Sequence, residues 1–341
     1  MDVNNVGTQK KLDDTCQDTN VETKPEGFEL KFLKNLDQGT RDRDSSIFSE
    51  DGQLFVKVSS GSSAGSLLKI YDTQNPAHIQ ELKIDRSVDY IALSPDKTRL
   101  FVWGRGQLAG INPSPFGPGL DQFNMDLSVW DIKTKTKINT IKKYDISKLP
   151  QVSFRHNGKM VAQRISNDSI DVWDLEHGLL KQQLKDIDQL HSIDYISASG
   201  SRLVVNNGTK KGVYDINSKD QIASITCGGH GKAVLSPDDH FLFCYDENNN
   251  ICMWDIASQS KVKEFVFAKR FHSNMAISPN GLYLAIIGDE EIFVWAVKSG
   301  SIIKKLLKEK SNPEALVFFT TDGRLFITQT FQTQIYGIQA N

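Results

Sequence analysis

A short run of β-branched and aromatic residues that ends in Trp-Asp or Tyr-Asp recurs along most of this chain. From the second copy onward, the aromatic residues lie about 41 residues apart. A second landmark, a turn of the Ser-Pro-Asp-Gly kind, recurs in phase with the first. A fixed period of this length indicates one supersecondary unit per repeat, so an array of similar units is predicted. The aromatic positions are Tyr71, Trp130, Trp173, Tyr214, Trp254, Trp295 and Tyr336.

Each repeat is predicted to contain four short strands. The turns carry Asp, Asn or Gly where the backbone reverses, and the flanking runs alternate apolar and polar residues as half-buried strands do. In the fifth repeat the four strands are KAVL, HFLFCY, ICMWD and KVKEFVF. A period of about forty residues with this content is typical of a propeller blade. The predicted fold is therefore all-β, a seven-bladed β-propeller of four-stranded blades.

The two phased landmarks resemble those of the WD-repeat β-propeller family, over roughly residues 28 to 341. The resemblance implies that the aromatic and acidic residues of the repeat are structural, and that Gly229-His230 corresponds to the Gly-His pair of that family. It also implies that the connection between the second and third strands of a blade emerges on the face that commonly meets partners. The residues predicted to be structural are Tyr71, Trp130, Asp131, Trp173, Asp174, Tyr214, Asp215, His230, Trp254, Asp255 and Trp295.

The N-terminal segment GFELKFLKNL is predicted to close the ring. Only five residues follow Tyr336, so the last blade lacks an outer strand of its own. Phe28, Leu30 and Phe32 alternate with charged residues, and such a strand would complete blade seven and cover an exposed sheet edge. Residues 27–341 are thus predicted to form a single propeller. Residues 1–26 are polar, and a disordered tail is favoured over a partner-binding one.

The stretch GRGQLAGINPSPFGPG interrupts the second repeat. The segment from the first turn to the aromatic residue is about eighteen residues longer there than in blades three to seven. Long loops in compact domains are often functional or disordered, so the insertion at 104–126 is a candidate partner-binding site, and packing against its own blade is the alternative. Blade one also runs long, with SSGSSAGS at its tip. The candidate partner-binding residues are Arg105, Asn112, Pro115, Phe116 and Phe123.

Charge and composition narrow the class of partner. The chain has 40 Lys and Arg against 42 Asp and Glu, a formal charge of −2, so it offers no broad basic field for nucleic acid. Lysines crowd the predicted outer strands, where a charged edge that prevents sheet pairing is favoured over a surface for RNA or an acidic partner. Nucleic acid is expected only within a ribosomal or initiation assembly.

No arrangement of residues indicates catalysis, a metal or a cofactor. Carboxylates fall in turns, where they are ordinary solvated residues, and no glycine loop of the phosphate-cradling type is present. His191, His230 and His272 occupy equivalent positions, and a structural role is favoured over a ring of metal ligands. The chain is therefore predicted not to be an enzyme, with no catalytic residues, no cofactor, no metal and no small-molecule substrate.

The cysteines and the hydropathy bear on location. Cys16, Cys227, Cys244 and Cys252 form no C-x-x-C pair and are expected to be reduced. No stretch approaches the roughly twenty apolar residues of a membrane span, and Met1 to Gly27 is too polar for a signal peptide. A cytoplasmic protein without membrane contact is predicted, with the nucleus left open.

A finer similarity concerns the second and third repeats. The insertion, LSVWDIKT from Leu127 to Thr134, and LPQVSFRHNGKMVAQR from Leu149 to Arg164 resemble the propellers of eukaryotic translation initiation factor 2A and of subunit b of factor 3. The function predicted first is a non-catalytic protein-protein interaction scaffold, a subunit or adaptor of a larger assembly that binds through blades one and two. A ribosome- or RNA-associated propeller of the initiation type is the alternative, and a propeller enzyme is third.

Overall fold

A computed structural model gives the fold of the chain. It describes residues 28–38, 46–49, 51–62, 65–75, 77–94, 96–107, 123–145, 152–154, 160–174, 179–228, 231–266, 271–288, 290–307, 316–328 and 332–340. The predicted tail at residues 1–26 lies outside this part.

The described residues form seven sheets of four antiparallel strands each, numbered here one to seven. The all-β propeller architecture predicted from the repeat is confirmed. The sheets are, in order, β2 (Ser46–Phe48), β3 (Leu54–Ser62), β4 (Gly65–Asp72) and β5 (Ile79–Ile84); β6 (Ser87–Leu93), β7 (Arg99–Gln107), β8 (Phe123–Asp131) and β9 (Thr136–Asp145); β10 (Val152–Phe154), β11 (Met160–Arg164), β12 (Ile170–Asp174) and β13 (Leu179–Leu184); β14 (Ser192–Ile196), β15 (Arg202–Asn206), β16 (Lys210–Asp215) and β17 (Gln221–Thr226); β18 (Val234–Leu235), β19 (Phe241–Tyr245), β20 (Ile251–Asp255) and β21 (Ser260–Phe265); β22 (Phe271–Ile277), β23 (Tyr283–Gly288), β24 (Glu291–Ala296) and β25 (Ser301–Leu307); β26 (Leu316–Phe319), β27 (Leu325–Thr328) and β28 (Gln332–Ala340) with β1 (Phe28–Gln38).

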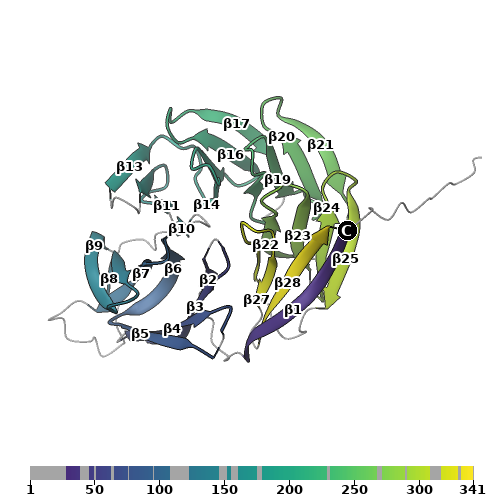
Figure 1. The fold of residues 1–341 in the computed structure, drawn as a ribbon. Helices are drawn as coiled ribbons and strands as arrows, with labels where there is room; N and C mark the ends of the chain where they lie inside the picture. Colours follow the sequence, from purple (N-terminus) through teal and green to yellow (C-terminus); the bar gives the residue numbers. More distant parts are fainter. Residues whose placement is uncertain are drawn as a thin grey trace, which may run out of the picture.

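The sheets are arranged around a common centre, with the first strand of each sheet innermost and the last at the perimeter (Figure 1). Sheet seven takes its outer strand from the other end of the chain, because β1 pairs with β28 from Phe28 opposite Ala340 to Gln38 opposite Gln332. Sheet seven also contacts sheet one. Phe326 packs with Phe55 and Tyr71, and the Arg324 guanidinium donates to the Asp51 carbonyl at 2.7 Å.

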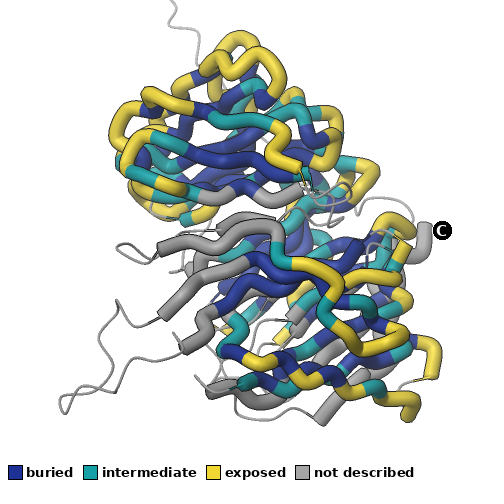
Figure 2. The backbone as a smooth tube through the Cα atoms, turned by 90° about the vertical axis from the view of Figure 1, so that its left-hand side faces the viewer, coloured by how far each residue is buried: buried dark blue, intermediate teal, exposed yellow. Residues whose placement is uncertain are grey.

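The core lies between the faces of neighbouring sheets. Buried backbone runs through the middle of the strands, and exposed backbone lies at their ends (Figure 2). Between sheets one and two, Trp130 belongs to the same apolar cluster as Leu68 and Ile84. Fully burying one large aliphatic or aromatic side chain contributes about 1.5–3 kcal/mol, so these interfaces supply most of the stability. Similar clusters join sheets three and four, four and five, five and six, and six and seven.

A buried hydroxyl holds the turn between the first and second strands of a sheet. In sheet six the Ser278 hydroxyl donates to Asn280 Oδ1 at 2.6 Å and accepts the Tyr283 backbone N–H at 2.9 Å. Such side-chain bonds fix a turn that the backbone alone cannot satisfy. In each described turn of this kind the hydroxyl contacts the side chain two residues on. The hydroxyls belong to Ser49, Ser94, Ser197, Ser236, Ser278 and Thr320, and all six residues are buried.

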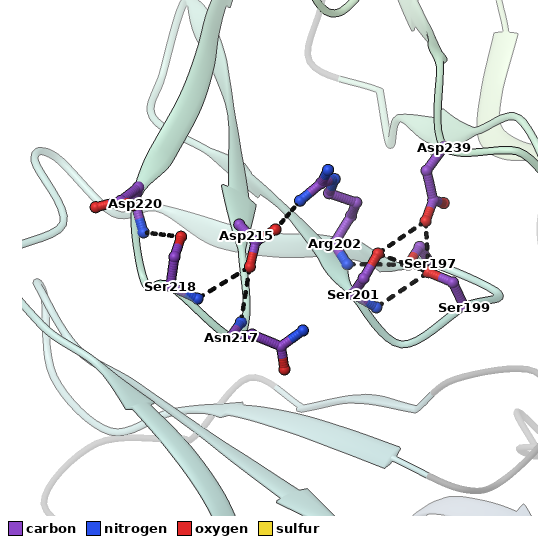
Figure 3. A network of polar contacts seen from close by, with 9 residues as sticks. All are labelled: Ser197, Ser199, Ser201, Arg202, Asp215, Asn217, Ser218, Asp220 and Asp239. Atoms are coloured by element: carbon purple, nitrogen blue, oxygen red, sulfur yellow. Dashed lines mark hydrogen bonds and ion pairs between the residues drawn. The ribbon is translucent and has the colours of Figure 1, made fainter.

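Sheet four departs from this pattern in an informative way. Its turn carries Ser199 at the position where the other described turns carry Asp or Asn. The carboxylate is supplied instead by Asp239 of sheet five, which accepts from both Ser199 and Ser201 (Figure 3). The substitution in the sequence is thus compensated by a contact between neighbouring sheets.

The acidic residue of the Trp-Asp repeat holds the next turn. Asp255 Oδ1 accepts the Ser258 backbone N–H and hydroxyl, both at 2.7 Å, and Asp131 holds Thr134 in the same way. The backbone N–H groups of these turns lower the pKa of both carboxyls. Because the folded-state pKa is depressed, this stabilisation is present above the unfolded pKa and is lost as the pH falls through the folded one.

The expectation that the cysteines are reduced is wrong for one pair. Cys227, which follows β17, is disulfide-bonded to Cys244 in β19, across the interface of sheets four and five. The two positions are 17 apart in sequence, and the packing of the two sheets brings them together. Spacing alone therefore could not indicate the bond. Cys252 is free and buried.

Replacing Ser278 by Ala is expected to lower the free energy of unfolding by about 1–3 kcal/mol, because the Tyr283 N–H loses its acceptor in a buried turn. Urea denaturation would measure the change. The matched control is Ser299→Ala, which removes an exposed hydroxyl from a turn of the same sheet and should cost less than about 0.5 kcal/mol. Equal losses in both variants would show that the buried hydroxyl does not hold the turn.

Removing the disulfide by Cys227→Ala together with Cys244→Ala should lower stability by about 2–4 kcal/mol, since a closed loop of this size restricts the unfolded chain. Thermal melting with and without a reductant would measure it. The wild type should lose stability on reduction and the double variant should not. A Cys16→Ser variant serves as the control, and a reductant-insensitive wild type would contradict the bond.

Candidate functional site

Among the described strands, the second and third strands are both long in two neighbouring sheets, whereas in sheet seven only the third strand, β28, is long and its second strand, β27, has four residues. In sheet two, β7 and β8 have nine residues each, whereas β19 and β20 of sheet five have five each. In sheet one, β3 and β4 have nine and eight residues. The extra residues lie at the ends of the strands next to the connection, so two long hairpins project from adjacent sheets. Their distal ends, residues 58–62 with 65–67 and residues 104–107 with 123–126, are called the long-hairpin surface below.

The structure corrects the extent of the predicted loops. Within the insertion at 104–126, residues 104–107 and 123–126 are paired strands, with Gln107 opposite Phe123. In sheet one the pairing continues to Ser62 opposite Gly65, so most of SSGSSAGS is a hairpin. The sequence suggested loops because serine and glycine are common there, but backbone pairing that continues from a stable sheet overrides a weak local preference.

The glycine that opens the insertion has a specific steric role. A Cβ atom on Gly104 would lie 1.9 Å from the Ser87 carbonyl oxygen, so β6 and β7 approach too closely there for any other residue. Gly104 therefore permits β7 to continue past the end of an ordinary blade strand. Residues 104–107, the first four of the interruption, are thus part of the paired β7–β8 hairpin.

The predicted partner-binding residues are only partly within the described chain. Arg105 lies on β7 opposite Ser87 of β6 and Met125 of β8, and Phe123 begins β8. Their backbones therefore lie on the long-hairpin surface. Asn112, Pro115 and Phe116 are outside the described residues, so a convergence of all five stays a prediction.

The repeat residues lie where the strands pack. Tyr71, Trp130, Trp173, Tyr214 and Trp295 are buried on the third strand of their sheets, and Trp254 is partly buried. The acidic residues Asp131, Asp215 and Asp255 each accept backbone N–H groups in the turn that follows. Asp174 ends β12. His230 lies outside the described residues.

A buried ion pair that sequence reasoning missed lies at the interface of sheets four and five. Lys211 of β16 is fully buried, and its Nζ lies 2.7 Å from Asp194 Oδ2 and 2.9 Å from the Gly231 carbonyl oxygen. The same carboxylate oxygen accepts the Ala233 N–H at 3.3 Å. Both charged groups thus bind the segment that leads into sheet five. No pattern of spacing in the sequence signals a lysine of this kind.

One cluster has the ligand types of a metal site. The ligand atoms of Asp246, Cys252 and Glu264 lie within 4.8 Å of one another. Glu264, however, already forms an ion pair with Lys261 at 2.5 Å and accepts a hydrogen bond from Asn250 at 2.9 Å. The lysine ammonium therefore already neutralises the charge of this carboxylate. Burial, with help from Asp246, raises the pKa of the Cys252 thiol to about 11. A thiol of this kind is a poor nucleophile and a poor metal ligand at neutral pH.

The predicted histidine positions do not give a described cluster. His191 is exposed; its backbone N–H donates to the Asn206 carbonyl at 2.8 Å, and its backbone carbonyl accepts from the Arg164 guanidinium. The side chain of His272 and the whole of His230 lie outside the described part. The described residues therefore do not form a ring of histidine ligands, and they do not decide whether one exists.

A groove lies at the perimeter between sheets one and two. It has a volume of about 570 Å³, and Leu67, Ile84 and Trp130 form its apolar surface. Lys83 of β5 and Lys137 of β9 also line it. Gly65 and Ser66, at the distal end of the β3–β4 hairpin, complete one side, so this perimeter groove adjoins the long-hairpin surface.

The arrangement of sheets and turns defines a β-propeller protein. No family model matches the chain. Part of it is similar to WD repeat-containing protein 18: the identity over 101 residues is 26% to the proteins of Rattus norvegicus and Mus musculus and 27% to that of Bos taurus. The match covers 30% of this chain and 23% of each relative. Fold and similarity together support a divergent WD-repeat propeller. Within the described chain, no helix has the length and apolarity needed to cross a bilayer.

Replacing Lys211 by Met should lower the free energy of unfolding by about 3–5 kcal/mol, because Asp194 is left charged, buried and unpaired. A second variant, Lys211→Met with Asp194→Asn, removes that charge and should be more stable than the single variant. Lys210→Met, at the exposed neighbouring position, is the control and should change stability by less than about 0.5 kcal/mol. Guanidinium denaturation would measure the free energy of unfolding of all three variants. A double variant that is no more stable than the single one would contradict the pairing of Lys211 with Asp194.

Proposed function

We propose that this chain is a non-catalytic scaffold that binds one or more proteins through the long-hairpin surface, as a subunit or adaptor of a larger assembly. One observation carries the proposal: the two long hairpins stand on adjacent sheets, whereas the corresponding strands of sheets four and five are five or six residues long. Similarity to WD-repeat proteins supports the same function at the level of the fold.

Such a scaffold would work by holding its binding strands in a fixed conformation before the partner binds. Strands that are packed and paired lose little conformational entropy when a partner docks, so more of the contact energy appears as affinity. The hairpins continue sheets whose inner residues are buried, as Phe101 and Trp103 of β7 are. A partner would therefore meet strands that are already ordered at their base.

The ring itself is part of the proposal. We infer that the seven sheets are the seven blades of one closed propeller, in which β1 completes the last blade. The pairing of β1 with β28 and the packing of Phe326 against Phe55 support this arrangement. Hydrogen exchange of the β28 amides would test it, because loss of residues 28–38 should expose them.

The absence of catalysis is likewise proposed. Turn carboxylates such as Asp131 and Asp255 are engaged with backbone N–H groups, which is a structural use. The alternative of an initiation-type propeller and the cytoplasmic location stay predictions.

Shortening the hairpin of sheet two should abolish partner binding without unfolding the protein. In the variant, Asn-Gly replaces residues 106–124 and so joins Arg105 to Met125, which already face each other across the pair. Affinity purification from native lysate with quantitative mass spectrometry would compare it with the wild type. Specific partners should be lost by tenfold or more, roughly the effect of removing one strong contact site.

The control replaces residues 298–300, a turn at the opposite end of the strands in sheet six, by Gly-Ser-Gly. It should retain every partner, and both variants should melt within a few degrees of the wild type. Unchanged partners in the shortened variant would refute binding through this hairpin.

A further inference from the structure

Three of the four cysteines lie close together where sheets four and five meet. Cys227 and Cys244 form the disulfide, with their Cα atoms 6.3 Å apart, and Cys252 is a free thiol. In the pairing of β19 with β20, Cys252 stands directly opposite Cys244. Residues that are directly opposite in an antiparallel pair have their side chains on the same face of the sheet, so the free thiol lies beside the disulfide.

The register of β19 and β20 also allows a second bond. Cα atoms of directly opposite residues are about 4.5–5.5 Å apart, and disulfides join Cα atoms that are about 4.4–6.8 Å apart. Cys244 can therefore bond either to Cys227, which follows β17 of sheet four, or to Cys252 of its own sheet. The two bonds are alternatives, because both use Cys244 Sγ.

Burial makes the attacking thiol an internal one. Cys244 is 0% exposed, and Cys227 and Cys252 are each 2% exposed. A thiol in solution therefore has little access to the disulfide of the folded protein, whereas Cys252 already lies next to it. Since a disulfide is broken by attack of a thiolate on one of its sulfurs, Cys252 is the nucleophile that the fold itself supplies.

The protonation of Cys252 determines when the attack can begin. Burial raises the pKa of its thiol to about 11; the carboxylates of Asp246 and Glu264 raise it further, and Lys261 lowers it. Asp246 Oδ2 lies 4.0 Å from the sulfur. Because only the thiolate attacks, the existing disulfide is retained at neutral pH, and exchange accelerates as the pH rises toward this pKa.

We propose that Cys252 exchanges with the disulfide and moves the bond from the interface of sheets four and five into sheet five. Cys252 loses its thiol proton to solvent, and the thiolate attacks Cys244 Sγ. The bond between Cys244 and Cys252 forms as the bond between Cys227 and Cys244 breaks, and Cys227 leaves as a thiolate that takes up a proton. One disulfide and one thiol are present before and after, so no oxidant or reductant is consumed.

The exchange would loosen the connection between the two sheets. This connection starts at Cys227, and near its other end the Gly231 carbonyl accepts from Lys211 at 2.9 Å. After exchange this polar contact remains, but the covalent link to β19 is lost. Lys232, the exposed residue that follows Gly231, should then be cut faster by trypsin, because local opening of the segment costs less free energy.

Tryptic mapping of the full chain distinguishes the two bonds. Trypsin gives peptide 220–232, which contains Cys227, and peptide 233–261, which contains the other two cysteines of the trio. The existing bond links the two peptides, whereas the exchanged bond lies inside the second peptide and leaves the first one free. The thiols are blocked with N-ethylmaleimide in acidic denaturant before digestion, so that no exchange occurs during it.

The protein is incubated without added thiol at several pH values between about 7 and about 10 at which circular dichroism shows it folded. The maleimide label should move from Cys252 to Cys227. Free peptide 220–232 should appear roughly tenfold faster for each unit of pH, since the thiolate fraction rises by that factor below the pKa. The rate should not depend on protein concentration, because the attack occurs within one chain.

Two variants are the controls. Cys252→Ser removes the attacking thiol and should keep the two peptides linked at every pH. Cys16→Ser removes the remaining thiol and should exchange as the wild type does.

Four results would overturn the proposal. They are no label on Cys227 at the highest pH at which the chain is folded, equal release of peptide 220–232 from the Cys252→Ser variant, a rate that rises in proportion to protein concentration, and peptides that are unlinked before incubation. The last result would also exclude the disulfide itself. Partner binding through the long-hairpin surface is unaffected by any of them, because the exchange involves only sheets four and five.

Discussion

The buried hydroxyl that holds the first turn of a sheet is the contact on which the propeller depends. In the described turns, each such Ser or Thr accepts an N–H at the start of the second strand or one residue before it, as Tyr283 N bonds to Ser278 Oγ at 2.9 Å. The turn thereby fixes the register of the first two strands, and the acidic residue of the repeat fixes the turn after the third. Because register decides which face of a strand is buried, these small bonds determine the packing of whole sheets.

Side-chain contacts between neighbouring sheets join the sheets to one another. Lys263 of β21 donates to the Val297 carbonyl at 3.0 Å in the next sheet, and Gln182 of β13 reaches the Asn217 carbonyl in the same manner. The buried pair of Lys211 and Asp194 adds a stronger bond between sheets four and five. A rigid support of this kind is what allows a long hairpin to hold its position before a partner arrives.

The sequence predicted what depends on local pattern and missed what depends on long-range packing. Alternation of apolar residues and recurrent turn residues sufficed for an all-β propeller with repeated strands. The disulfide of Cys227 and Cys244, the ion pair of Lys211 and the contact of Asp239 with Ser199 join residues of neighbouring sheets and have no signature in spacing. Binding through blades one and two stays a prediction, and the loops predicted there were overestimated, because β7 and β8 continue into the insertion.

We propose that partners contact the side of the propeller formed by sheets one and two. Cross-linking mass spectrometry of the protein isolated with its bound partners tests this most directly, because described lysines lie on several sheets. If partners bind there, cross-links to partner proteins should concentrate at Lys57, Lys69, Lys83 and Lys137. Cross-links confined to Lys298 and Lys304 of sheet six, with none at those four, would contradict it.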